Sequence, residues 1–195
     1  LNRKGMHMSQ PPPRQSQADV DAQFLQRWSP RAFSDQPVEP QTLLSLLEAA
    51  RWAPSAANEQ PWLFLVPENE EALQRFRSLL NPGNQRWACR APLLLYLLGR
   101  RNWSKSGQAN YTYQFDCGSA FMSLALQATK QNLFVHPMAG FDREKAYELL
   151  QIDKEKYDII VAVAVGYYGD AGGLPEDLQE REHPSRRKDL PEIYS

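Results

Sequence analysis

Apolar residues recur with the spacing of an α-helix in two long segments of the chain. In the first, between Pro40 and Pro54, they are Leu43, Leu44, Leu46, Leu47, Ala50 and Ala53. In the second, residues 115–132, small or apolar side chains cover most of the helical circumference. The first pattern predicts an amphipathic helix, because proline suits the first turn and Pro54 ends the pattern. The second predicts a helix buried either in a subunit interface or in the core.

Shorter apolar runs predict strands. Residues 62–66 and 92–98 are uninterrupted apolar runs of strand length, and they predict two buried strands. Residues 158–166 are rich in Val, Ile and Ala, which predicts another strand. After Gly166 the pattern becomes irregular, so a wandering tail is expected.

Capping and breaking residues predict further helices. One runs from Asp19 towards Arg27, one covers residues 69–80 and stops at Asn81-Pro82-Gly83, and one runs from a cap at Asp142 to about Leu150. Together with the strands, these helices predict a mixed α/β fold.

Length and charge limit the class of protein. The 195 residues suffice for one domain with a sizeable core. We expect it to cover residues 18–195, after a disordered or vector-derived arm over residues 1–17. A net charge of −1 provides no global basic field, which disfavours nucleic acid and anionic membranes as partners. No apolar run approaches the roughly 20 residues of a membrane span, so a soluble protein is expected.

The two cysteines, Cys89 and Cys117, lie far apart and belong to no disulfide or metal-binding pattern. This usage favours a reducing compartment, and we expect a cytoplasmic protein without a metal site. His136 and His183 each precede a proline, which favours structural turns over catalytic positions.

The segment Arg27-Trp28-Ser29-Pro30-Arg31 sets two guanidinium groups and a hydroxyl at alternate positions. An extended backbone would direct Arg27, Ser29 and Arg31 to one side. Arginine donors match the geometry of a phosphate group, so this segment is a candidate anion site. The alternative is a solvated helix terminus.

Two more polar segments are candidates. Asn58 and Gln60 also alternate, between prolines, and each amide carries the donor and acceptor needed to bind the edge of a heterocycle. An ordinary loop is the alternative. Near the C-terminus, Arg186, Arg187 and Lys188 form either a solvated basic run or a second contribution to the same anion site.

The order of several motifs resembles the nitroreductase family of FMN-dependent oxidoreductases over about residues 23–192. They are Arg27-x-Ser29-x-Arg31, Pro54-Ser55-x-x-Asn58-x-Gln60-Pro61-Trp62, Ala91-Pro92, Asp116-x-Gly118, Met138-Ala139-Gly140-Phe141-Asp142, Val165-Gly166-Tyr167 and Arg187-Lys188-x-Leu190. The resemblance implies an α/β (α+β) fold with a mixed sheet flanked by helices. It also implies a long central helix at a homodimer interface and a C-terminal extension that wraps the partner subunit.

The resemblance implies an FMN at that interface, contacted by both subunits. Arg27, Ser29 and Arg31 would hold its phosphate and the pyrimidine side of its ring, with Arg27 near N1. Asn58 would contact the ring or ribityl chain, and Gln60 would do the same or brace its loop. The backbone of Pro137, Met138, Ala139 and Gly140 would lie against the flavin N5. One or two of Arg186, Arg187 and Lys188 would contact the phosphate.

The implied activity is ping-pong transfer of two electrons from NADH or NADPH to a small acceptor such as a nitroaromatic or a quinone. No acid or base side chain is required, because the chemistry takes place on the flavin N5. Three alternatives stay open: a family member acting on another conjugated ligand, a non-catalytic flavin-binding module or sensor, and an RNA-binding domain, which the acidic charge balance disfavours.

Overall fold

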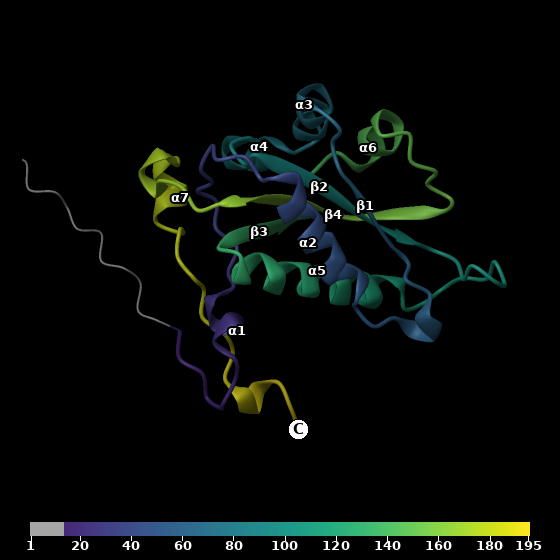
Figure 1. Ribbon diagram of the computed structural model, residues 1–195, viewed down its shortest axis with the longest axis horizontal. Coiled ribbons are helices and arrows are strands. Elements are labelled where there is room, and N and C mark those ends of the chain that lie inside the picture. Colours follow the sequence, from purple (N-terminus) through teal and green to yellow (C-terminus); the bar gives the residue numbers. More distant parts are fainter. Residues whose placement is uncertain (1–13) are drawn as a thin grey trace, which may run out of the picture.

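The computed structural model describes residues 14–195. Its centre is a four-stranded sheet of order β1-β2-β4-β3 (Figure 1). The strands are β1 (Trp62–Leu65), β2 (Leu93–Arg100), β3 (Leu133–Met138) and β4 (Tyr157–Tyr167). All three strand pairs are antiparallel. A mixed α/β fold is confirmed, whereas the prediction of mixed strand directions is wrong for the sheet in this part of the chain.

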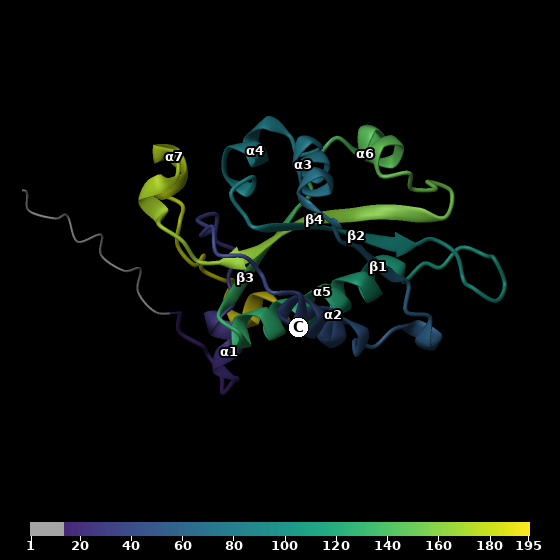
Figure 2. The ribbon, with the colours of Figure 1, turned by 45° about the horizontal axis from the view of Figure 1, so that its top comes forward.

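Helices cover both faces of the sheet (Figures 1 and 2). On one face lie α2 (Pro40–Arg51) and α5 (Tyr113–Lys130), and on the other α3 (Glu70–Ser78), α4 (Pro82–Ala88) and α6 (Arg143–Leu149). Successive residues of β2 point to opposite faces: Leu93 and Leu95 join the α2–α5 core, and Leu94 and Tyr96 join the other. Residues 93–98 of β2 are therefore all apolar or aromatic. The edge strand β1 is only partly buried, which corrects the expectation of two buried strands.

Local signals fix the helix ends. Pro40 occupies the first turn of α2, and the Asp142 side chain accepts a hydrogen bond from the Lys145 amide at the start of α6, as predicted. Asn81-Pro82-Gly83 follows the end of α3 and also begins the next helix, α4. The Asn81 side chain accepts a hydrogen bond from the Asn84 amide (3.0 Å) and caps α4, a helix that the sequence analysis missed.

Helix α5 is buried on the side that packs on the sheet and open on the other. Cys117, Ala120 and Leu124 are buried, whereas Phe115 is 78 % exposed. In a single chain the helix is thus amphipathic. None of the helices between residues 14 and 195 combines the length and apolarity that a membrane crossing needs.

The N-terminal arm and the C-terminal tail both run beside α1 (Ala22–Gln26), as Figure 1 shows. The tail contains η2 (Ala171–Gly173), α7 (Glu176–Gln179) and η3 (Leu190–Glu192). Of the expected arm, residues 1–13 lie outside the described part. Its remaining residues are tied down, because the Gln17 side chain bonds Asp189 and the backbone amide of Leu190.

Candidate functional site

The predicted anion segment lines a cavity of about 380 Å³ at the end of the sheet where β3, α1 and the tail meet. Arg27, Ser29 and Arg31 all face this cavity, and so does Arg187 from the tail. The other lining residues are Arg14, Trp28, His136, Arg181, His183 and Ser185. Five arginines therefore surround one cavity in a chain whose net charge is −1.

A buried carboxylate holds the anion segment in place. The Glu182 side chain, fully buried, accepts hydrogen bonds from the backbone amides of Arg31 (2.8 and 3.0 Å) and Ala32 (2.8 Å). The Arg31 guanidinium lies 3.9 Å from the same carboxylate. At the other end of the segment, the Arg27 amide donates to Gln23 as α1 ends (2.9 Å), and Arg27 has extended dihedral angles.

Burial and mutual repulsion shape the electrostatics of the cavity. Burial lowers the pKa of Arg27, and the neighbouring charge of Arg187 lowers it further. Burial also lowers the pKa of Arg31, with Arg181 acting in the same direction and Glu182 opposing it. Because arginine stays protonated at neutral pH, the cavity concentrates positive charge. It suits an anion.

His136 supports the wall of this cavity from β3, which corrects the expectation of a turn. Its Nδ1 lies 2.8 Å from the Pro30 carbonyl oxygen, and its ring centroid lies 4.4 Å from that of Trp87. Burial lowers the pKa of His136 to about 4, and the charge of Arg31 adds to the effect. The imidazole is therefore neutral at pH 7, with Nδ1 protonated towards the carbonyl.

The second polar segment folds into a strained loop, with η1 (Ala56–Asn58) at its centre. Ala57, Asn58 and Gln60 have φ angles of 50°, 56° and 48°. Asn58 and Gln60 thus alternate in the sequence on a backbone that is not extended. Each left-handed residue costs roughly 1–2 kcal/mol, and such strain concentrates at functional sites.

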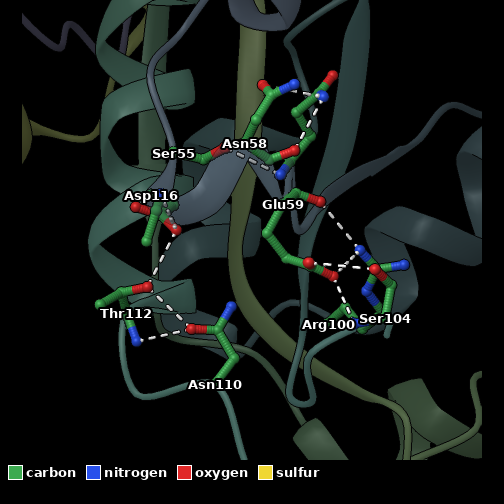
Figure 3. A network of polar contacts seen from close by, with 10 residues as sticks. Ser55, Asn58, Glu59, Arg100, Ser104, Asn110, Thr112 and Asp116 are labelled. Atoms are coloured by element: carbon green, nitrogen blue, oxygen red, sulfur yellow. Dashed lines mark hydrogen bonds and ion pairs between the residues drawn. The ribbon is translucent and has the colours of Figure 1, made fainter. Parts of the chain in front are cut away.

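A polar network imposes this loop conformation (Figure 3). The Ser55 hydroxyl accepts from the Gln60 amide (2.9 Å), and Asp116 in the first turn of α5 accepts from the Ala56 amide (3.3 Å). The Glu59 carboxylate accepts from Arg100 Nη2 (2.7 Å) and from the Ser104 amide (2.6 Å). The loop is thereby fixed to α5, β2 and the segment after β2.

The two candidate segments do not meet within one chain. The loop that carries Asn58 and Gln60 lies at the N-terminal end of α5, whereas α1 and the tail lie near its C-terminal end (Figures 1 and 2). The arginine cavity is lined by residues that follow α1 and residues of the tail. A helix of 18 residues spans about 27 Å at 1.5 Å per residue. Within the chain, Gln60 Nε2 bonds instead to Asn58 Oδ1 (3.2 Å) and to its backbone oxygen (3.1 Å).

Of the remaining predicted site residues, some line the arginine cavity and others do not. Pro137 and Met138 end β3, and Ala139 and Gly140 follow it, but none of the four lines the cavity. The Gly140 carbonyl accepts from Asn84 Nδ2 (2.9 Å), which packs this turn against α4. In the basic run only Arg187 lines the cavity, whereas Arg186 and Lys188 are exposed outside it. Arg14 and Arg181 line the cavity but were not predicted, since no local motif marks them.

The fold and the cavity define an α/β protein with a cationic pocket suited to a phosphate-bearing ligand. Residues 24–82 and 79–167 match the model of the nitroreductase family. The chain belongs to this family, and the resemblance seen in its motifs is confirmed.

Solved structures and curated proteins agree with this assignment. A structure described as an oxidoreductase containing FMN is 41 % identical, covers 93 % of each chain and superimposes with a TM-score of 0.88. A nitroreductase-family structure in complex with FMN, from Exiguobacterium sibiricum, is 19 % identical with a TM-score of 0.73, covers 93 % of this chain and 98 % of its own, and shows the shared fold. A Bacillus subtilis (strain 168) protein whose name proposes NAD(P)H nitroreductase activity is 22 % identical in an alignment of 169 positions that covers 69 % of this chain and 81 % of the relative.

Proposed function

We propose that the protein is an FMN-dependent oxidoreductase that transfers two electrons from NADH or NADPH to a small acceptor such as a nitroaromatic or a quinone. The arginine cavity carries this proposal. A phosphomonoester has about −1.5 to −2 charges at neutral pH, which matches a cavity rich in guanidinium groups. The FMN in the 41 % identical structure and the NAD(P)H in the names of curated relatives support the choice of cofactor and donor.

The residues of the cavity fit FMN. The half-buried Arg27 guanidinium lines the cavity and forms no hydrogen bond or ion pair within residues 14–195, so its donors are available to an anionic ligand. The family resemblance implied a place for Arg27 near N1 of the ring. Because Arg27 neighbours Arg187 whereas Arg31 neighbours Glu182, we propose instead that Arg27, Ser29 and Arg187 hold the phosphate end and that Arg31 lies towards the ring. Bound FMN supplies hydride acceptance and electron transfer, and a nearby guanidinium stabilises the negative charge of the reduced ring.

A homodimer would complete the site. Because Asn58 and Gln60 lie at the opposite end of α5 from the cavity, a second copy running antiparallel along α5 would bring its loop to the first copy's arginines. The open side of α5 and α2 carries the apolar side chains that such an interface needs: Leu44, Trp52 and Phe115 are 57 %, 72 % and 78 % exposed. The C-terminal tail, in which Tyr194 is 68 % exposed, would wrap the partner subunit.

We extend the proposal to the chain as a whole. Residues 18–195 would form one FMN-binding domain that works in the reducing cytoplasm, where Cys89 and Cys117 stay free thiols. The backbone turn at Ala139 and Gly140 would approach the flavin N5 of a site completed by the partner subunit. Its small side chains leave room for such an approach.

An anaerobic reduction experiment tests the proposed activity. The FMN-loaded protein is mixed with NADH or NADPH, and the visible absorption of oxidised flavin is followed. We expect rapid loss of that absorption with at least one donor, and its return when a quinone is added. Tight FMN binding without reduction by either donor would contradict the oxidoreductase and identify a flavin-binding module instead.

A further inference from the structure

Arg14 lines the arginine cavity although it lies before the family match, which starts at residue 24. Its Nη1 donates to the backbone oxygens of Arg27 (2.7 Å) and Leu25 (3.3 Å). Its Nε is buried and finds no acceptor among residues 14–195. Two of the five guanidinium N–H groups, both on Nη1, are thus used to anchor the side chain, and because Nε–H is buried, the two N–H groups of Nη2 remain for a ligand.

The arm that carries Arg14 is fastened to the tail. Gln17 Nε2 donates to Asp189 Oδ1 (2.8 Å), and the Leu190 amide donates to Gln17 Oε1 (2.7 Å). These paired bonds lie next to the tail segment that brings Arg187 into the cavity. One end of the chain therefore delivers Arg14 and the other delivers Arg187 to the same ligand position.

The five arginines form two groups with different charge balance. Arg31 and Arg181 influence each other and share the region of the Glu182 carboxylate. Burial lowers the pKa of Arg14 and of Arg27, and the positive charge of Arg187 lowers both further; within residues 14–195 none of the three forms an ion pair. An anion with more than one negative charge would offset the repulsion among these three guanidinium groups. The group of Arg14, Arg27 and Arg187 is therefore the better candidate for binding a phosphate.

We propose that Arg14 binds the terminal phosphate of the flavin and makes the site select FMN over unphosphorylated riboflavin. The proposal rests on the proposed FMN site, and it adds a residue from the N-terminal arm to that site. The arm and the tail act together as a strap across the phosphate, held closed by Gln17.

Equilibrium titrations of the flavin-free full-length protein test this assignment. The Kd values for FMN and riboflavin are measured for the wild type, Arg14→Gln, Arg14→Lys and the control Arg75→Gln, an exposed arginine on α3. A hydrogen bond to a charged group contributes about 1.5–3 kcal/mol, so Arg14→Gln should weaken FMN binding by about 10- to 100-fold. Riboflavin binding should not change, Arg14→Lys should lie between, and Arg75→Gln should match the wild type.

A second pair of measurements separates recognition from folding. Inorganic phosphate should compete with FMN less well in Arg14→Gln than in the wild type, and Gln17→Ala should cause a smaller loss that is again specific for FMN. Equal weakening of FMN and riboflavin in Arg14→Gln would show that Arg14 only supports the backbone at Arg27, and it would overturn the proposal. Unchanged FMN binding would overturn it as well. A wild type that binds neither flavin would overturn the FMN site itself.

Discussion

Replacing Glu182 with glutamine tests how the anion segment is held. The substitution keeps the size of the side chain and removes its charge. One amide oxygen can still accept from the Arg31 and Ala32 amides, each 2.8 Å from Oε1 of the carboxylate. The amide nitrogen would replace Oε2, which lies 3.0 Å from the Arg31 backbone nitrogen and 3.9 Å from the Arg31 guanidinium. The two bonds to Oε1 become neutral, and both the bond to Oε2 and the attraction to the Arg31 guanidinium are lost.

The magnitude follows from these contacts. A hydrogen bond to a charged acceptor contributes about 1 kcal/mol more than a neutral one, so Glu182→Gln should lower the free energy of unfolding by about 2–3 kcal/mol. Glu182→Ala leaves two buried amides unpaired and should cost about 3–5 kcal/mol. With a urea slope of roughly 2 kcal/mol/M, the midpoint for Glu182→Gln should fall by about 1 M.

Urea unfolding followed by circular dichroism measures this effect. All variants are compared at one protein concentration, because a dimer's midpoint depends on it. Glu180→Gln, an exposed carboxylate two residues earlier, is the matched control and should stay within about 0.5 kcal/mol of the wild type. If Glu182→Gln unfolded at the same urea concentration as Glu180→Gln, the carboxylate would not hold the segment.

Three further predictions address pH, packing and assembly. The folded protein keeps His136 neutral down to a pKa of about 4, whereas an unfolded histidine has a pKa of about 6.5. The stabilisation by neutral His136 is therefore complete above about pH 6.5 and is lost as the pH falls towards 4. Across this range the free energy of unfolding should fall by about 3 kcal/mol more in the wild type than in His136→Gln. Gly169→Ala places a Cβ 2.6 Å from backbone atoms of Phe33 and should lower the free energy of unfolding, measured by heat or urea, by about 1–3 kcal/mol or more. In the control Gly83→Ala the nearest atom lies 3.7 Å from the Cβ, so the protein should not be destabilised. Equal unfolding midpoints for the two variants would show that Gly169 is not required for packing. Phe115→Lys should shift the protein to monomers and weaken FMN binding in sedimentation and titration experiments, while Leu149→Lys, on the other face of the sheet, should do neither; a stable Phe115→Lys dimer would exclude the proposed interface.

The sequence predicted most of the fold because helix caps and apolar periods are local signals. The stripe after Pro40 and the cap at Asp142 each involve residues within a few positions of one another. The same locality explains the missed helix α4. Asn81-Pro82-Gly83 has the composition of a stop, but Asn81 and Pro82 are also good starting residues, and only the chain that follows decides between the two.

The candidate site was predictable only where its residues are neighbours in the sequence. Arg27, Ser29 and Arg31 share one extended segment, and the structure brings them into one cavity. Arg14 and Arg181 reach that cavity through tertiary folding of the arm and the tail, which no spacing rule indicates. No local rule predicts the left-handed backbone at Asn58, because it is imposed by bonds from this loop to Asp116 and to the Ser104 amide. Those contacts come from distant elements.

The proposed function requires that FMN binds in the arginine cavity. The most direct test is a titration of the flavin-free protein with FMN for the wild type, Arg27→Ala and the control Arg75→Gln. We expect the wild type and Arg75→Gln to take up one FMN per chain with the same affinity, and Arg27→Ala to bind it at least about 10-fold more weakly, since a charged hydrogen bond is lost. No uptake by the wild type, or equal affinity in all three proteins, would contradict the account.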